Sequence, residues 1–224
     1  YLLLMLTMLT AAIASAKDYP ASLFNIYSDG VTLNTRSIQY AIDYISQEGG
    51  GRLVFSVGRY LTGSIELKSG VTLELQEGAV LLGSLNPFDY EKKDWTALVF
   101  AYDQQPIGIT GKGIIDGQGQ LMAREVIDVI GKGFMKDALR DGRPEAPNRP
   151  VLINFHQSRD ITVSGITLKN SSSWVEVYDH CTNLRIDGIH VDSKAYWNND
   201  GIDIVDCDHV TVTNSFIDAD DDGI

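Results

Sequence analysis

Three stretches near the end of the chain repeat one pattern: RDITVSGITL (159–168), TNLRIDGIHV (182–191) and DHVTVTNSFI (208–217). Their first apolar position moves from Ile161 to Leu184 and on to Val210, in steps of 23 (184 − 161) and 26 (210 − 184) residues. Within each copy the apolar residues alternate, shift by one position and alternate again, as in two short β-strands separated by a bend. This all-β repeat predicts a parallel β-helix, a solenoid that is right-handed by the crossover rule.

Weaker copies of the repeat lie upstream, at Val71–Leu75 and Ile107–Thr110. The Leu/Asn signature of a leucine-rich repeat is absent, and a β-sandwich would lack the shared register. The segment 34–49 has apolar residues at helical spacing and ends in glycines, so we expect a helix that caps the first coil. The charged segment 120–150 is weakly helical, and we interpret it as a long loop or helical insertion.

The bulk composition favours one exported domain. The 224 residues are 44% hydrophobic, and the net charge of −12 argues against a nucleic-acid partner. Residues 1–16 form an apolar run ending in Ala14-Ser15-Ala16, which indicates part of a signal peptide and a secreted or periplasmic protein. No other run is long enough for stable membrane insertion. We therefore assign 17–224 to a single β-helix domain.

Both ends of the sequence suggest an incomplete chain. Position 1 is Tyr instead of Met, and the chain stops at Ile224, inside a motif. We expect the β-helix to be truncated on its C-terminal side. The chain by itself should then be inactive and prone to aggregate through its open edge, whereas the full-length protein should be a monomer.

Two acidic motifs stand one coil apart, Asn198-Asn199-Asp200-Gly201 and Asp220-Asp221-Asp222-Gly223, and Asp221 follows Asp200 at a distance of 21 positions (221 − 200). Stacked coils lie about 4.8 Å apart, so Asp200 should approach Asp221 and Asp222. Crowded carboxylates split their pKa values, which suits acid/base hydrolysis of a glycosidic bond. Two alternatives remain: ordinary solvated turn residues, and a calcium loop that begins at Asp218.

Other residues allow two interpretations each. Trp174 and Trp197 flank the acidic motifs and could stack on a sugar ring or pack in the core. Cys181 and Cys207 occupy equivalent repeat positions, so they either stack as small side chains or form a disulfide. The four histidines show no metal-ligand spacing, and we predict neither a metal nor a cofactor.

The acidic motifs also carry a family resemblance. Asn198-Asn199-Asp200-Gly201 resembles the N-T-D-G motif of glycoside hydrolase family 28, the polygalacturonases and related pectin hydrolases, with Asn in place of Thr. Asp221-Asp222-Gly223-Ile224 resembles the D-D-C-I segment of that family. Further matching segments are Gly49-Gly50-Gly51, Tyr60-Leu61-Thr62-Gly63, Leu67-Lys68-Ser69, Asp116-Gly117-Gln118-Gly119, Arg149-Pro150 and Asn170-Ser171-Ser172-Ser173-Trp174.

The resemblance implies a right-handed parallel β-helix that hydrolyses α-1,4-linked galacturonic acid in pectic polysaccharide or oligosaccharide, with inversion and without a metal. Asp221 would protonate the leaving oxygen, and Asp200 and Asp222 would hold and deprotonate the attacking water, about 6.5–9.5 Å from the acid. We expect the substrate to be bound by Asn198, Trp197 and Trp174.

The sequence also departs from the family. Its Gly-His-Gly histidine and Arg-Ile-Lys pair are not in this chain, and its Trp-x-Ile-His segment is here Trp174-Val175-Glu176-Val177. Local Arg and Lys must offset the acidic charge if the substrate is a polyanion. A rhamnogalacturonan hydrolase, a non-catalytic carbohydrate-binding β-helix and a calcium-dependent pectate lyase are the alternatives.

Overall fold

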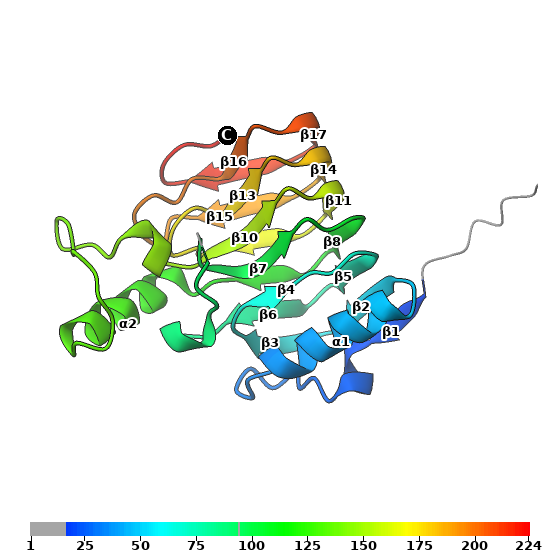
Figure 1. Cartoon of the computed structure of the whole chain (residues 1–224), viewed down its shortest axis with the longest axis horizontal. Helices are drawn as coiled ribbons and strands as arrows, with labels where there is room; N and C mark the ends of the chain where they lie inside the picture. Colours follow the sequence, from blue (N-terminus) through cyan, green and yellow to red (C-terminus); the bar gives the residue numbers. More distant parts are fainter. Residues whose placement is uncertain (1–16, 94) are drawn as a thin grey trace, which may run out of the picture.

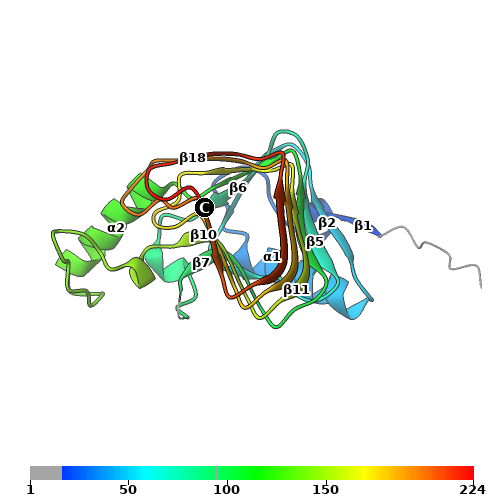
Figure 2. The same cartoon turned by 90° about the horizontal axis from the view of Figure 1, so that it is seen from above.

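The computed structural model describes residues 17–93 and 95–224 (Figure 1). The chain winds into a right-handed parallel β-helix whose coils stack into three sheets (Figure 2). Every pairing between the named strands is parallel. The predicted signal peptide, residues 1–16, lies outside the described residues.

The first sheet is the longest. In spatial order it contains β1 (Asp18–Pro20), β2 (Gly51–Phe55), β5 (Val71–Leu75), β8 (Ile107–Gly111), β11 (Arg159–Ser164), β14 (Thr182–Asp187) and β17 (Asp208–Thr213). Its register matches the repeat in the sequence, because Ile161 pairs with Leu184 and Leu184 pairs with Val210. The weaker upstream copies, β5 and β8, belong to the same sheet, so the predicted solenoid is confirmed.

The second sheet carries the second strand of each repeat. It contains β3 (Gly58–Thr62), β6 (Ala79–Gly83), β9 (Ile114–Asp116), β12 (Thr167–Lys169), β15 (His190–Ser193) and β18 (Phe216–Ala219). Leu168, Val191 and Ile217 stand in register here. The Asp218–Gly223 segment thus begins inside a strand, so the interpretation as a helix-flanked calcium loop is wrong.

The third sheet, called the groove sheet below, was not predicted from the sequence. It contains β4 (Ile65–Glu66), β7 (Ala97–Tyr102), β10 (Val151–His156), β13 (Glu176–Asp179) and β16 (Ile202–Val205). Its strands are buried on both faces along much of their length, so their sequences do not alternate between apolar and polar residues.

The inner faces of all three sheets form one continuous core. The cysteines belong to it as stacked thiols: both are free, and the Cys181 backbone N–H donates to the Cys207 Sγ at 3.3 Å. The interpretation in which the two cysteines stack as small side chains is therefore confirmed, and the disulfide is not formed.

Two helices complete the described structure. The helix α1 (Thr35–Gln47) lies across the first coils with Ile38, Ala41, Ile42 and Ile45 fully buried, which confirms the predicted cap. The helix α2 (Gly119–Gly131) and the loop after it lie beside the coils, next to the groove sheet (Figure 2), so the predicted insertion is helix and loop together. Three short 3₁₀ helices are Ala21–Phe24, Pro87–Asp89 and Ala146–Asn148. Within the described residues, neither helix is long and apolar enough to cross a membrane.

Candidate active site

The two acidic motifs lie side by side on successive coils. The Gly201 N–H donates to the Asp222 carbonyl at 2.8 Å, and the Ile202 N–H donates to the Gly223 carbonyl at 3.1 Å. Gly201 allows this approach, since a Cβ there would come within 2.5 Å of the Gly223 carbonyl oxygen. Asp200 therefore stands beside the segment that carries Asp222, as the coil spacing predicts.

Burial and charge both act on Asp200. Its pKa is raised, first by partial burial and then by the neighbouring Asp221 and Asp222 carboxylates. Its Oδ1 is buried and has no hydrogen-bond partner among the described residues. Asp221 and Asp222 themselves are exposed, so the cluster combines a half-buried carboxyl group with two solvated ones.

A fourth carboxyl group, Asp203 in β16, joins the three predicted aspartates. Burial, followed by the charges of Asp200 and Asp222, raises the pKa of Asp203 to about 7. Ile202 and Ile204 contact the core, so by strand alternation Asp203 faces the outer side of the groove sheet. Sequence reasoning missed this residue, although its position three residues after Asp200 and inside a strand was a usable signal.

The two asparagines of the first motif have different roles. Asn199 is fully buried and makes four hydrogen bonds. Its Oδ1 accepts from the Ser193 hydroxyl (2.7 Å) and the Ala195 N–H (2.9 Å), and its Nδ2 donates to the carbonyls of Ser171 (3.1 Å) and Ser173 (2.9 Å). Asn199 thus fixes the turn that presents Asp200.

Asn198 is held by Arg149, a second residue whose role was missed. Arg149 is only 3% exposed, and its guanidinium donates to the Asn198 Oδ1 at 3.1 Å and to the carbonyls of Trp197 (2.6 Å) and Ser172 (2.9 Å). It connects the loop after α2 to the first acidic motif. The side-chain oxygen of Asn198, predicted to bind substrate, is therefore already engaged with Arg149.

A groove runs along the outer face of the groove sheet toward the carboxylates. One cavity of about 290 Å³ is lined by Trp95, Tyr102, Asn154, His156, Trp174, Val177, Asp179 and Val205. Asn154 pairs with Val177, and Val177 pairs with Asp203, so the row of floor residues leads to the acidic cluster. Trp174 stacks on Trp95 at 4.6 Å between ring centroids.

Cationic side chains border the same region. The Lys93 Nζ lies 4.4 Å from the centroid of the Phe100 ring. The guanidinium carbon of Arg143 lies 4.6 Å from the centroid of the Trp197 ring. Arg140, Arg143 and Arg149 line a pocket together with Asn198. Positively charged side chains therefore lie close to the first acidic motif. Trp197 is 58% exposed, so the alternative in which it packs in the core is wrong.

The structure thus combines a parallel β-helix, a cluster of carboxylates and a neighbouring cavity bordered by aromatic residues. Residues 52–224 match the model of glycosyl hydrolases family 28. The chain belongs to that family.

Individual relatives are longer than this chain. A Vitis vinifera protein described as "Probable polygalacturonase" is 33% identical over 93% of this chain and 44% of its own length. The exo-poly-α-D-galacturonosidase of Dickeya chrysanthemi is 26% identical over 97% of this chain and 43% of its own length. The family 28 exopolygalacturonase of Yersinia enterocolitica superposes with a TM-score of 0.81 at 27% identity, covering 92% of this chain and 44% of that structure. The chain thus spans less than half the length of these relatives.

Proposed function

We propose that the protein is a secreted glycoside hydrolase that cleaves α-1,4-linked galacturonic acid in pectin by an inverting acid/base mechanism. The observation that carries the proposal is the cluster of Asp200, Asp203, Asp221 and Asp222 at the end of the groove. Residues 1–16 would direct export to the periplasm or the medium, and residues 17–224 would belong to one β-helix domain that acts as a monomer.

In this mechanism Asp221 donates its proton to the glycosidic oxygen as the bond between that oxygen and the anomeric carbon breaks. Asp200 and Asp222 bind a water molecule on the opposite face of the sugar and accept its proton as its oxygen bonds to the anomeric carbon. The proton that Asp203 retains up to pH of about 7 reduces the negative charge beside Asp200. The positions of Asp200 and Asp222 on adjacent coils support their role as a pair that holds one water.

The groove supports a galacturonate polymer as the substrate. The paired indoles of Trp95 and Trp174 offer an apolar wall for sugar rings. Lys93 and Arg143 are the cations that carboxylates along the polymer would meet. The names of the Vitis and Dickeya relatives point to the same polymer.

Product analysis on polygalacturonate with the full-length protein tests the proposal. Hydrolysis releases saturated reducing sugars, whereas a lyase releases products that absorb as unsaturated uronates. Asp221→Asn should lower the rate about 10²–10⁴-fold because an amide cannot donate the proton. Asp160→Asn, which changes an exposed aspartate near the start of β11 in the first sheet, is the matched control and should keep the wild-type rate. Unsaturated products, or more than about a tenth of the rate in Asp221→Asn, would contradict the mechanism.

A further inference from the structure

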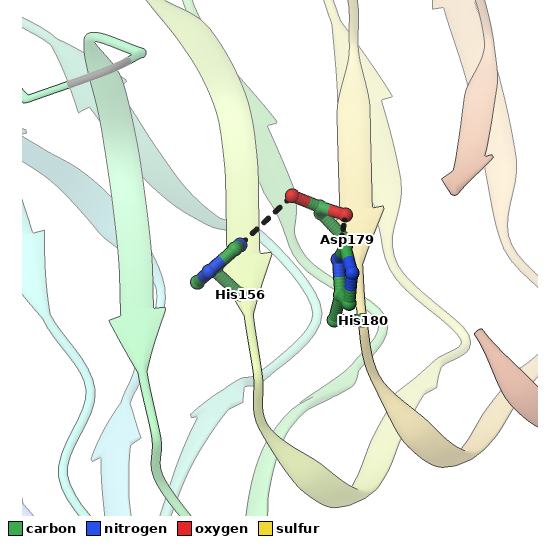
Figure 3. Close-up of side chains that lie close together, drawn as sticks. All are labelled: His156, Asp179 and His180. Carbon is green, nitrogen blue, oxygen red and sulfur yellow. Dashed lines mark hydrogen bonds and ion pairs between the residues drawn. The ribbon is translucent and has the colours of Figure 1, made fainter. Parts of the chain in front are cut away.

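Two of the four histidines of the chain meet a shared carboxylate at the edge of the groove sheet (Figure 3). His156 is the last residue of β10 and Asp179 the last residue of β13, and the two are paired in register. His180 follows Asp179 with a φ of 53°, which turns its side chain back toward the same carboxylate. In Figure 3 the carboxylate lies between the two imidazole rings.

The contacts within this group are short. The His156 Nδ1 lies 2.9 Å from the Asp179 Oδ2, and the His180 Nδ1 lies 2.5 Å from the Asp179 Oδ1. One possible ligand atom from each of the three residues falls within 4.8 Å of the others. The side chains are between 29% and 54% exposed, so they can adjust to a ligand without repacking the core.

We propose that His156, Asp179 and His180 bind a divalent transition-metal ion of the zinc class. Two imidazoles and one carboxylate are the donor set that such ions prefer, and three protein ligands leave a coordination position open. With metal–ligand bonds of about 2.0–2.2 Å, ligand atoms in a tetrahedral site lie roughly 3.4 Å apart. The observed separations reach at most 4.8 Å, so rotations of the three partly exposed side chains would have to close the larger ones to that value.

The proton positions are compatible with this site. A carboxylate only accepts hydrogen bonds, so without an ion each Nδ1 that faces Asp179 carries a proton. An ion would replace those protons, and each neutral ring would then carry its proton on Nε2. The His180 Nε2 lies 3.8 Å from the Asp206 Oδ2, and this carboxylate can orient the ring as the outer partner of a metal-bound histidine.

The surroundings favour a divalent cation that reaches the site from solvent. Asp179 and Asp206 supply two negative charges around two neutral rings, which balances a charge of +2. His156 and Asp179 also line the groove cavity, so the ion and its open position are accessible. A purely structural hydrogen-bonded group of His, Asp and His is the competing explanation, and it predicts no selective affinity for these ions.

Calorimetric titration of the full chain with Zn²⁺ at pH 7.5 tests the site. We expect one equivalent to bind, and His156→Gln and His180→Gln each to weaken binding at least tenfold. His209→Gln is the matched control, because His209 also pairs with an aspartate (Nδ1 to the Asp208 Oδ2, 2.8 Å) but without a second imidazole. Its affinity should equal that of the wild type. Ca²⁺ and Mg²⁺ in excess should not compete, since they prefer oxygen donors.

A second measurement needs no substitution. Of the four imidazoles, only those of His156 and His180 should shift their ring-proton NMR signals when one equivalent of Zn²⁺ is added. The proposal is overturned if no stoichiometric binding occurs, if all three histidine variants bind equally, or if His190 and His209 shift as much. These readouts are independent of the action on pectin, so either proposal can fail alone.

Discussion

Asn199 connects the acidic cluster to the body of the β-helix. All four hydrogen-bonding capacities of its buried amide are used, on residues of its own coil and of the coil below. The neighbouring Asp200 carboxyl, by contrast, keeps one buried oxygen without a partner among the described residues. Asn199, whose amide is fully hydrogen-bonded, therefore fixes the backbone next to Asp200, whose buried oxygen lacks a partner at a cost in free energy. Such an arrangement is expected where a carboxyl group is positioned for chemistry.

Asn199→Ala should lower the free energy of unfolding by at least about 2 kcal/mol, because it leaves buried donors and acceptors without partners. Urea unfolding measures this loss. Thr211→Ala, at an exposed position of β17, is the control and should stay within about 0.5 kcal/mol of the wild type. Equal midpoints for both variants would show that Asn199 does not hold the turn.

At this scale the grouping of the carboxylates could be predicted from the sequence, whereas the hydrogen bonds that hold the turn could not. Asp200, Asp221 and Asp222 could be found because carboxylates repeat at one coil period. Asn199 and Arg149 could not be assigned their roles, because they bond carbonyl groups on other coils, such as that of Ser171, 28 residues from Asn199, and that of Ser172, 23 residues from Arg149. Only the fold brings those groups within reach.

The groove sheet provides the surface on which we propose that the substrate binds. Its outer face supplies the floor of the groove, and residues just before its strands supply the paired indoles of Trp95 and Trp174. The sequence predicted the other two sheets, whose residues alternate between core and solvent. It did not predict the groove sheet, because residues on both faces of β10 and β13 are buried. Their sequences therefore lack the alternation of apolar and polar residues that marks a strand with one solvent face.

Because the groove sheet was not predicted, the grouping of His156, Asp179 and His180 was missed as well. His156 and His180 are 24 residues (180 − 156) apart, which matches no short metal-binding motif. It is, however, the length of one coil plus one residue. Assigning β10 and β13 to one sheet would have placed His156 opposite Asp179.

Removing the indole that forms one wall of the groove should weaken the binding of oligogalacturonate. We expect Trp174→Ala to raise the Kd about tenfold, equivalent to about 1.4 kcal/mol, since the stack on Trp95 and the sugar-facing surface are both lost. Fluorescence or calorimetric titration measures the change. Phe134→Ala removes a 72% exposed aromatic ring in the loop after α2 and should leave the Kd unchanged. Equal affinities in both variants would place the polymer elsewhere.

Across the whole molecule, a continuous apolar core holds the coils together, and α1 covers the N-terminal end of the β-helix. One carboxyl group lies inside this core. Glu176 of β13 is fully buried between Ile153 and Ile202, its strand partners, and the Tyr178 hydroxyl donates to its Oε2 at 2.6 Å. Its Oε1 has no partner among the described residues. Burial raises the pKa of Glu176 to about 8.

This buried acid makes the stability of the β-helix depend on pH. The pKa of Glu176 is higher in the folded state (about 8) than its ordinary value of 4.5, so the folded state binds the proton more tightly. Its contribution to stability is complete below pH 4.5 and is lost as the pH rises toward about 8. The aspartates whose pKa is lowered to about 2, Asp29 and Asp187, act in the opposite direction but below pH 4.

We therefore expect Glu176 to lower the free energy of unfolding by as much as about 1.4 kcal/mol per pH unit through this window, the slope for one proton. Asp203, whose pKa is raised to about 7, adds a slope of the same sign up to about pH 7. Glu176→Gln should remove the Glu176 slope alone, because the amide does not titrate, so the difference in free energy of unfolding between wild type and variant should change steadily between pH 4.5 and 8. Glu77→Gln, at an exposed position, should keep the wild-type slope. Urea unfolding at several pH values measures all three proteins. Parallel curves for wild type and Glu176→Gln would mean that the core carboxyl is ionised at little cost.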